Sequence, residues 1–278
     1  MQETLICIFT RNRPCELCIN LMGLFKQTYK DWDLMIIDDC SDVPVQTNPL
    51  ITKIVGRISR EGHNVKIKRF DKNIGIATAR ACILDELKKY KYVVDLNDDH
   101  FLEPDCLERL REVISNENIG AVTPATPFFF GDDEGNDPIY FIHKKYDPNR
   151  MFNAIRVSKG ENGEKRLTLS RQVDYIYDIK KPIKIEHGSQ LMYKPELIDE
   201  LPKHYSNLGF TEETDLSLRI AKAGKEIWFV PTAINWHLQS SQGGTRSISL
   251  EERRRKAEKD FDKFHKTWWD WLWENGYR

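Results

Sequence analysis

The segment Tyr92–Asp105, YVVDLNDDHFLEPD, constrains the fold more than any other part of this chain. Its apolar, β-favouring start is typical of a buried strand in a parallel sheet. The run ends in Asn97, Asp98 and Asp99, and Pro104 then marks the first turn of a helix. Ligands collect outside the carboxyl ends of such strands, and carboxylates crowded there repel one another unless a cation lies between them. The segment therefore predicts a cation site, with a solvated Asp-rich turn as the alternative.

Strand and helix patterns alternate through the first half of the chain, with short connections. The expected strands are 4–9, 33–37, 65–70, the run from Tyr92, and 120–123. The expected helices are 14–27, 50–60, 76–90 and 107–114. This alternation predicts an α/β fold with a doubly wound, mostly parallel sheet.

The alternation stops in residues 128–181, which are rich in Asp, Gly, Asn and Lys. Short alternating runs at 139–142 and 167–169 indicate hairpins, so this region is either a flap over a ligand or a plain surface insertion. Core patterns return as 182–193, a helix at 211–223 and a strand at 226–230, and a last charged helix begins at Ser249.

Composition excludes several classes of protein. The chain has 278 residues, with 42 Lys and Arg against 43 Asp and Glu, which gives no global attraction to nucleic acid. No apolar run approaches the length of a membrane span, and the N-terminus lacks the pattern of a signal peptide. Only one CxxC pair, Cys15 and Cys18, is present among six cysteines, so a two-pair zinc site is not expected. We expect reduced thiols in a cytoplasmic protein.

Several polar motifs are expected to meet at one edge of the sheet. They are IIDDCSD at 36–42, NxGxxxAR at 73–80, NDDH before Pro104, EExDLSLR at 212–219, and His237. Carboxylates, an arginine and an imidazole converging on one sheet edge indicate a metal-assisted nucleotide site.

In this order and spacing, the motifs resemble those of family 2 glycosyltransferases with the GT-A fold, over roughly residues 3–240. The resemblance implies a GT-A-type sheet with an inserted hairpin region and a C-terminal helix. It implies a catalytic domain at 1–248, with a nucleotide-binding half at about 1–124 and an acceptor-side half at about 125–248. It also implies inverting, metal-dependent transfer of a sugar from a nucleoside diphosphate, foremost a UDP-sugar, to a hydroxyl group.

The resemblance assigns the nucleotide-binding residues. Asp39 matches the carboxylate that reads the base, and an acceptor there would take the N3–H of uracil or thymine, or the N1–H of guanine. Asp98 matches the position near the ribose. Asn97 matches the first position of the same acidic motif, where the family has a carboxylate. Arg80 would lie near the nucleotide, with a helix-surface arginine as the alternative. Arg246, in a Gly-containing loop at 242–247, would close over the diphosphate unless that loop is a linker.

The resemblance also assigns a metal and a base. Asp99 matches the metal ligand and His237 a further ligand; oxygen ligands suit Mn²⁺ or Mg²⁺, and an imidazole favours Mn²⁺. Glu213 matches the catalytic base, usually Asp in the family, with Glu212 as the fallback. These departures, and His100 after the acidic pair, leave two alternatives open: a nucleotidyltransferase, and a sugar-nucleotide-binding protein without activity.

The tail, 249–278, predicts an amphipathic aromatic helix. Phe264, Trp268 and Trp271 share one stripe, while Trp269 and Trp273 fall off it. Three interpretations are open: packing on the enzyme or in a homodimer, contact with a membrane surface, and a nucleic-acid contact, which is not favoured. The acceptor would be a glycan, a lipid-linked molecule or another hydroxyl compound, met in the cytoplasm or at the inner face of the membrane.

Overall fold

A computed structural model describes residues 2–130, 144–148, 152–171, 174–240 and 243–278 of the chain. Its central sheet contains β1 (Thr4–Thr10), β2 (Trp32–Asp38), β3 (Val65–Arg69), β4 (Tyr92–Asn97), β5 (His100–Leu102), β6 (Ile119–Ala125), β9 (Ile183–Ile185), β10 (Met192–Tyr193) and β11 (Glu226–His237). The strands follow the order β3-β2-β1-β4-β10-β6-β11-β5, with β9 paired to β11. The first four are parallel, and β10 lies antiparallel between β4 and β6. The predicted mostly parallel α/β sheet is confirmed.

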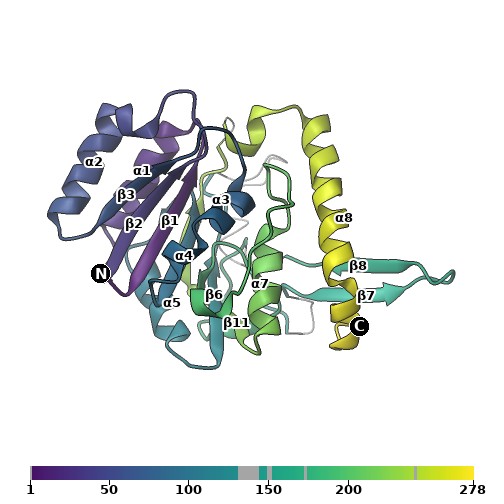
Figure 1. Cartoon of the computed structure of the whole chain (residues 1–278). Helices are drawn as coiled ribbons and strands as arrows, with labels where there is room; N and C mark the ends of the chain where they lie inside the picture. Colours follow the sequence, from purple (N-terminus) through teal and green to yellow (C-terminus); the bar gives the residue numbers. More distant parts are fainter. Residues whose placement is uncertain (1, 131–143, 149–151, 172–173, 241–242) are drawn as a thin grey trace.

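Helices cover both faces of this sheet (Figure 1). They are α1 (Pro14–Phe25), α2 (Pro49–Arg60), α3 (Ile76–Cys82), α4 (Leu84–Leu87), α5 (Cys106–Ile114), α7 (Glu212–Lys222) and α8 (Leu250–Glu274), with short 3₁₀ turns at Val45–Thr47, Pro195–Leu197 and Gly244–Ser247. None of the helices in the described part of the chain is long and apolar enough to cross a membrane.

Strand β1 shows how the sequence divides its side chains between the two faces. Ile6 and Ile8 join a core that contains residues of α1, α2 and α5, whereas Leu5, Cys7 and Phe9 join a core with residues of α3, α4 and α7. Because successive side chains of a strand point to opposite faces, a continuous apolar run is what a strand covered on both sides requires.

Some expected boundaries differ from the structure. The helix predicted at 76–90 is interrupted at Ile83, which has φ −116° and ψ 9° and separates α3 from α4. The strand predicted at 226–230 continues to His237, because a register irregularity between Val230 and Ile234 accommodates Pro231. Strand β5 was not predicted; its three residues pair antiparallel with the end of β11.

The region between β6 and β9 contributes one hairpin, β7 (Ile155–Lys159) with β8 (Lys165–Leu169), which forms a separate two-stranded sheet. Helix α8 packs beside it (Figure 1). The run predicted at 139–142 lies outside the described residues.

Packing of the tail on the same chain is the arrangement observed. Trp268 and Trp269 are 4% and 3% exposed. Trp269 was expected off the buried stripe, but its indole stacks on Trp273 and donates to the carbonyl of Arg166 on β8, because the hairpin widens the covered face of the helix.

Candidate functional site

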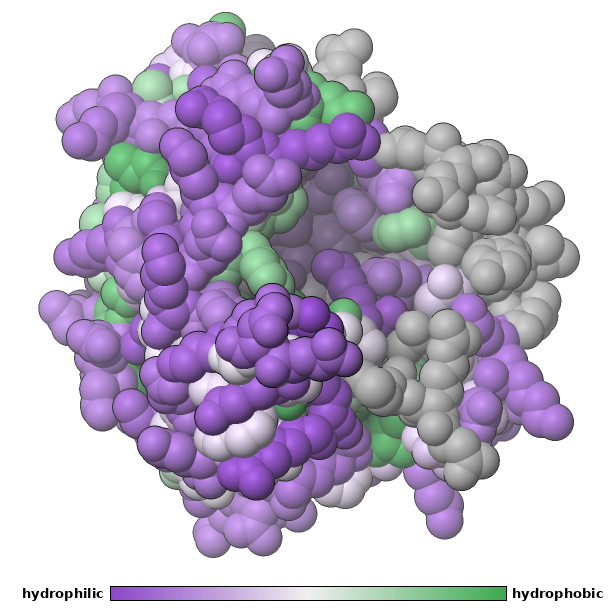
Figure 2. Space-filling model, turned by 90° about the vertical axis from the view of Figure 1, so that its right-hand side faces the viewer, coloured by the Kyte–Doolittle hydropathy of each residue, from purple (hydrophilic) through white to green (hydrophobic). Residues whose placement is uncertain are grey.

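A pocket of about 790 Å³ lies at the carboxyl ends of β1 and β4, between the start of α7 and the turn at Gly244–Ser247. It is lined by most of the predicted site residues: Asp39, Asn97, Asp98, Asp99, Glu212, Glu213, His237 and Arg246. Motifs more than 100 positions apart in the sequence therefore meet in one place. Figure 2 shows a largely hydrophilic face of the molecule with a hollow near its centre.

The two carboxylates that follow β2 have different environments. Asp38 is buried and accepts hydrogen bonds from the amides of Ser41 and Val45 and from the guanidinium of Arg69, so it closes the turn. Asp39 faces the pocket, and its two oxygens accept from the amides of Ile74 and Gly75, both at 2.8 Å. Burial raises the pKa of Asp39 against these hydrogen bonds. Each oxygen keeps a second lone pair for a ligand.

Asp98 and Asp99 are held by one arginine. The Arg13 Nη1 atom lies 3.1 Å from Asp98 Oδ1 and 2.9 Å from Asp99 Oδ2. The Thr10 hydroxyl donates to the other oxygen of Asp98 at 2.8 Å. Burial, and then the charge of Asp99, raise the pKa of Asp98 to about 7. Burial also opposes ionisation of Asp99, but a hydrogen bond and charge from His237 outweigh it and hold the pKa of Asp99 below its usual range.

Two histidines complete the polar cluster around Asp99. The rings of His100 and His237 stack with centroids 4.7 Å apart, and each presents Nε2 to Asp99, at 3.9 Å from Oδ1 and 3.5 Å from Oδ2. Asp99, His100 and His237 offer ligand atoms that all lie within 4.8 Å of one another. Burial lowers the pKa of His100 to about 3, so its ring is neutral. A neutral imidazole is the form that binds metals.

This donor set fits a divalent cation. One carboxylate and two imidazoles are suited to Mn²⁺ and other first-row transition metals. The Nε2 atoms that face Asp99 are the imidazole nitrogens available to such a cation.

The start of α7 presents two glutamates with different roles. Glu212 is 7% exposed and forms an ion pair with Arg80. Arg80 also lies 2.5 Å from Asp95, so one guanidinium faces two buried carboxyls. Burial raises the pKa of Glu212 to about 8. Glu213 is more open; its Oε1 accepts from the backbone amide of Gln190 at 2.9 Å and from the side-chain amide at 3.2 Å.

Arg80 does not line the pocket. Its side chain is 2% exposed and lies beneath Glu212. It is therefore neither the surface arginine considered above nor, in this conformation, a group that a nucleotide could touch. Its ion pairs fix the start of α7 to the sheet strand β4, which positions Glu212 and Glu213.

Three site residues were not identified from the sequence. Arg13 lies at the end of the polar turn after β1. His100 departs from the family motif, and nothing in the sequence marks it as a ligand. Gln190 lies in the segment 182–193, which has the pattern of a core strand. Gln190 has φ 53°, and its side-chain oxygen accepts from the amide of Asn97 at 3.0 Å, so it bridges Asn97 and Glu213. A non-glycine residue in this backbone region is uncommon and often functional, but the sequence carries no signal for it.

A second cavity of about 220 Å³ adjoins the pocket beyond Glu213. Its other lining residues include His187, and the residues that it shares with the pocket are Arg171, Gly209, Thr211, Glu212 and Glu213. The His187 Nε2–H donates to the carbonyl of Ser170 at 2.8 Å, and burial lowers the pKa of His187 to about 4. The imidazole that lines this cavity is therefore neutral.

Residues 5–201 match the model of a family described as glycosyl transferase family 2. No curated protein matches the sequence. Among solved structures, GalNAc-T7 with UDP, GalNAc and Mn²⁺ is similar with a TM-score of 0.65 and 14% identity. That match covers 97% of this chain and 49% of GalNAc-T7, so the chain spans about half the length of that protein.

A second similar structure is S. aureus TarS 1-349 in complex with UDP-GlcNAc. It has a TM-score of 0.58 and 14% identity, covering 95% of this chain and 73% of the TarS chain. With sequence identities this low, the structural similarity establishes a shared fold alone.

Proposed function

The chain belongs to glycosyl transferase family 2. We therefore propose that it transfers a sugar from a nucleoside diphosphate, UDP, to a hydroxyl acceptor, with inversion at the anomeric carbon. The observation that carries the proposal is the convergence of Asp39, Asp99, His237 and Glu213 on one pocket. Two structures of the same fold were solved with UDP or a UDP-sugar, which supports the choice of nucleotide.

On the donor side, Asp39 would read the base. Its carboxylate is fixed by two backbone amides and faces the pocket, so it can accept the N3–H of uracil without rotating. Neutral cytosine and adenine lack that donor, so they would be discriminated against. Arg246 lines the same pocket and would meet the diphosphate, and Asn97 and Asp98 would lie near the ribose.

Asp99, His100 and His237 would hold a divalent cation, for which Mn²⁺ suits the two imidazoles. When bound, the cation would supply positive charge to the leaving diphosphate. Asp99 and His237 were the ligands expected from the sequence, and His100 is added by the structure.

Glu213 would act as the general base on the acceptor hydroxyl. Two hydrogen bonds from Gln190 orient its carboxylate, and it borders both the donor pocket and the smaller cavity, where an acceptor hydroxyl would enter. Glu212 is less suited, because it is 7% exposed and its carboxylate is already held in the ion pair with Arg80.

The test is incubation of the full chain with a panel of labelled UDP-sugars and Mn²⁺, with release of UDP as the readout. We expect turnover with at least one sugar, and a decrease of roughly 10²–10⁴-fold for Glu213→Gln with unchanged UDP affinity. Glu213→Asp, the residue usual in the family, is the matched control and should retain more activity than the amide.

Near-normal turnover by Glu213→Gln would exclude Glu213 as the base. Absence of both UDP binding and UDP release in the folded wild-type chain would exclude the proposed function together with the sugar-nucleotide-binding alternative. UDP binding without release from any sugar would exclude the transfer activity and leave the non-catalytic alternative.

A further inference from the structure

Arg13 lies at the centre of the site, although it belongs to the turn before α1. Its side chain is 8% exposed. The Nη1 atom donates to both Asp98 and Asp99, and the Nη2 atom donates to the carbonyl of Gly243 at 3.3 Å. One guanidinium therefore joins the acidic pair at the end of β4 to the turn that carries Arg246.

The turn rests directly on this side chain. Gly243 and Gly244 both have positive φ, and a Cβ atom added to either would lie 2.6 Å from Arg13 Cγ or 2.8 Å from Arg13 Cζ. Only glycine permits so close an approach in this backbone conformation. The amide of Gly244 also donates to the carbonyl of Arg11 at 3.3 Å, so the turn is held to the segment after β1.

A divalent cation held by Asp99, His100 and His237 would share the Asp99 carboxylate with Arg13. Asp99 Oδ2 accepts from Arg13 at 2.9 Å and lies 3.5 Å from His237 Nε2. Two cations on one buried carboxylate repel each other strongly, because little water screens them. Binding of the metal must therefore weaken the Arg13–Asp99 contact, and by linkage that contact must weaken metal binding.

We infer that Arg13 is a positioning residue that acts as a built-in counterion: it neutralises Asp98 and Asp99 in the empty site and yields Asp99 to the incoming divalent cation. Because the same guanidinium holds Gly243, occupancy of the metal site is coupled to release of the turn at Gly244–Ser247, which presents Arg246 to the pocket. This inference rests on the proposed function for the identity of the cation.

The test is titration of the full chain with Mn²⁺, following the free ion by electron paramagnetic resonance, with and without UDP. Arg13→Gln should bind Mn²⁺ at least about tenfold more tightly than the wild type, since a competing charge is removed. Arg11→Gln is the matched control for the metal titration: it removes the same charge from the same segment, and among the described residues its guanidinium donates to Ser247 and pairs with neither Asp98 nor Asp99.

A second readout follows the turn. Hydrogen exchange of the amides of Gly244 and Arg246, which donate to Arg11 and Gly243, should accelerate when Mn²⁺ binds the wild type. In Arg13→Gln the exchange should be fast without metal. Arg13→Lys keeps the charge but loses the second nitrogen, so it should keep weak Mn²⁺ binding and still show fast exchange. This variant also serves if the glutamine variant does not fold.

Equal Mn²⁺ affinity of the wild type and Arg13→Gln, or an equal gain in Arg11→Gln, would overturn the inference. Exchange in the wild type that does not respond to Mn²⁺ would overturn the coupling. If UDP binds normally in either case, the proposed function stands while the role of Arg13 falls; loss of UDP binding by the wild type itself would remove the proposed function instead.

Discussion

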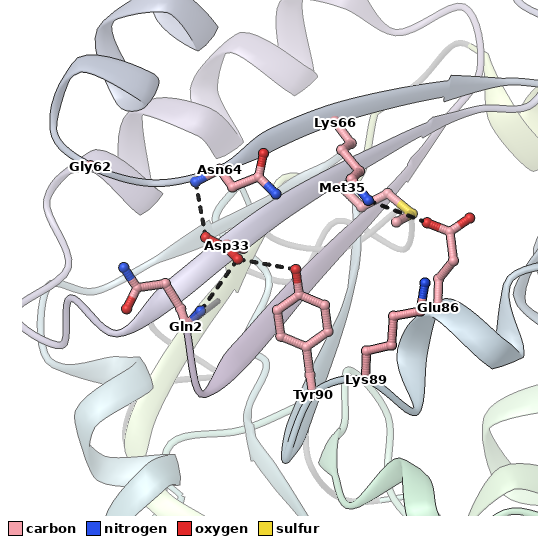
Figure 3. A pocket seen from close by; sticks show the side chains of 9 residues that line it. All are labelled: Gln2, Asp33, Met35, Gly62, Asn64, Lys66, Glu86, Lys89 and Tyr90. Carbon is pink, nitrogen blue, oxygen red and sulfur yellow. Dashed lines mark hydrogen bonds and ion pairs between the residues drawn. The ribbon is translucent and has the colours of Figure 1, made fainter.

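The two ends of the central sheet both contain buried carboxylates, but the surroundings of these carboxylates differ. At the amino ends of the strands, a pocket of about 320 Å³ borders Asp33, which accepts from the amides of Gln2 and Asn64 and from the hydroxyl of Tyr90 (Figure 3). At the carboxyl ends, Asp98 and Asp99 are adjacent and share Arg13, and the Nε2 atoms of His100 and His237 face Asp99. A buried carboxylate whose hydrogen bonds are all made by the protein, such as Asp33, has a structural role. Adjacent carboxylates with histidine nitrogens facing them indicate a binding site.

The largest effect should come from Asp99. Asp99→Asn removes the charge to which both imidazoles are aimed, so Mn²⁺-dependent affinity for UDP and sugar transfer should each fall by about 100-fold or more. Calorimetric titration of UDP with and without Mn²⁺ and a transfer assay measure this. Asp33→Asn is the control at the other end of the sheet and should keep both properties per folded molecule. A similar loss of UDP affinity and transfer in both variants would contradict the assignment of binding to the carboxyl ends of the strands alone.

Asp33→Asn should instead lower the free energy of unfolding. The amide cannot accept from all the donors around it, and leaving buried donors unpaired costs roughly 2–3 kcal/mol here. Urea denaturation of the wild type, Asp33→Asn and Asp99→Asn measures the difference. We expect Asp99→Asn to lose less free energy of unfolding than Asp33→Asn, because the asparagine relieves repulsion from Asp98. That result would support a structural role for Asp33 and a binding role for Asp99.

Asp260 on α8 is another buried carboxylate, and it connects the last helix to the site. It accepts from the amide and hydroxyl of Ser206 and from the amide of Phe210, in the loop before Glu212. Asp260→Ala should lower stability by about 2 kcal/mol and turnover by about tenfold, since the loop lines the pocket. Asp262→Ala, an exposed carboxylate on the same helix, is the matched control. Lost stability with unchanged turnover would make Asp260 purely structural.

The smallest effect concerns pH. Burial opposes ionisation of Glu3, but hydrogen bonds from Arg111 and Lys91 lower the pKa of Glu3 to about 2. A carboxyl with a depressed folded pKa stabilises the fold above its unfolded pKa of about 4.5, and this contribution is lost as pH falls toward 2. Glu3→Gln should therefore be about 1 kcal/mol less stable at pH 7, after allowance for screening, and no less stable near pH 2. Thermal unfolding across this range measures the difference; a gap that stays constant with pH would contradict the assignment.

The sequence was sufficient to predict the parallel part of the sheet and the position of the site at its edge. Continuous apolar strands ending in Asp38 or Asn97 required a parallel sheet, and parallel strands bring their ends to one edge. It could not reveal Arg13, because an arginine in a polar turn is ordinarily a surface residue and its partners lie 85 and 86 positions away. Nor could it place Trp269, whose burial depends on a hairpin from a distant segment. The division at residue 248, and any contact of α8 with a membrane or a second copy, stay predictions.

The packing of α8 against the rest of the chain determines where this protein can be truncated or fused to another. Trp268 donates to Asp215 at 2.9 Å, and Asp260 holds the loop before Glu212, so the last helix braces the one that carries Glu213. The family match stops at residue 201, before that helix begins. A truncated version designed on the match alone would keep the Asp39 and Asp98–Asp99 turns and lack Glu213 altogether. One trimmed after β11 would keep Glu213 on an unsupported segment, so engineered fragments must extend through residue 274.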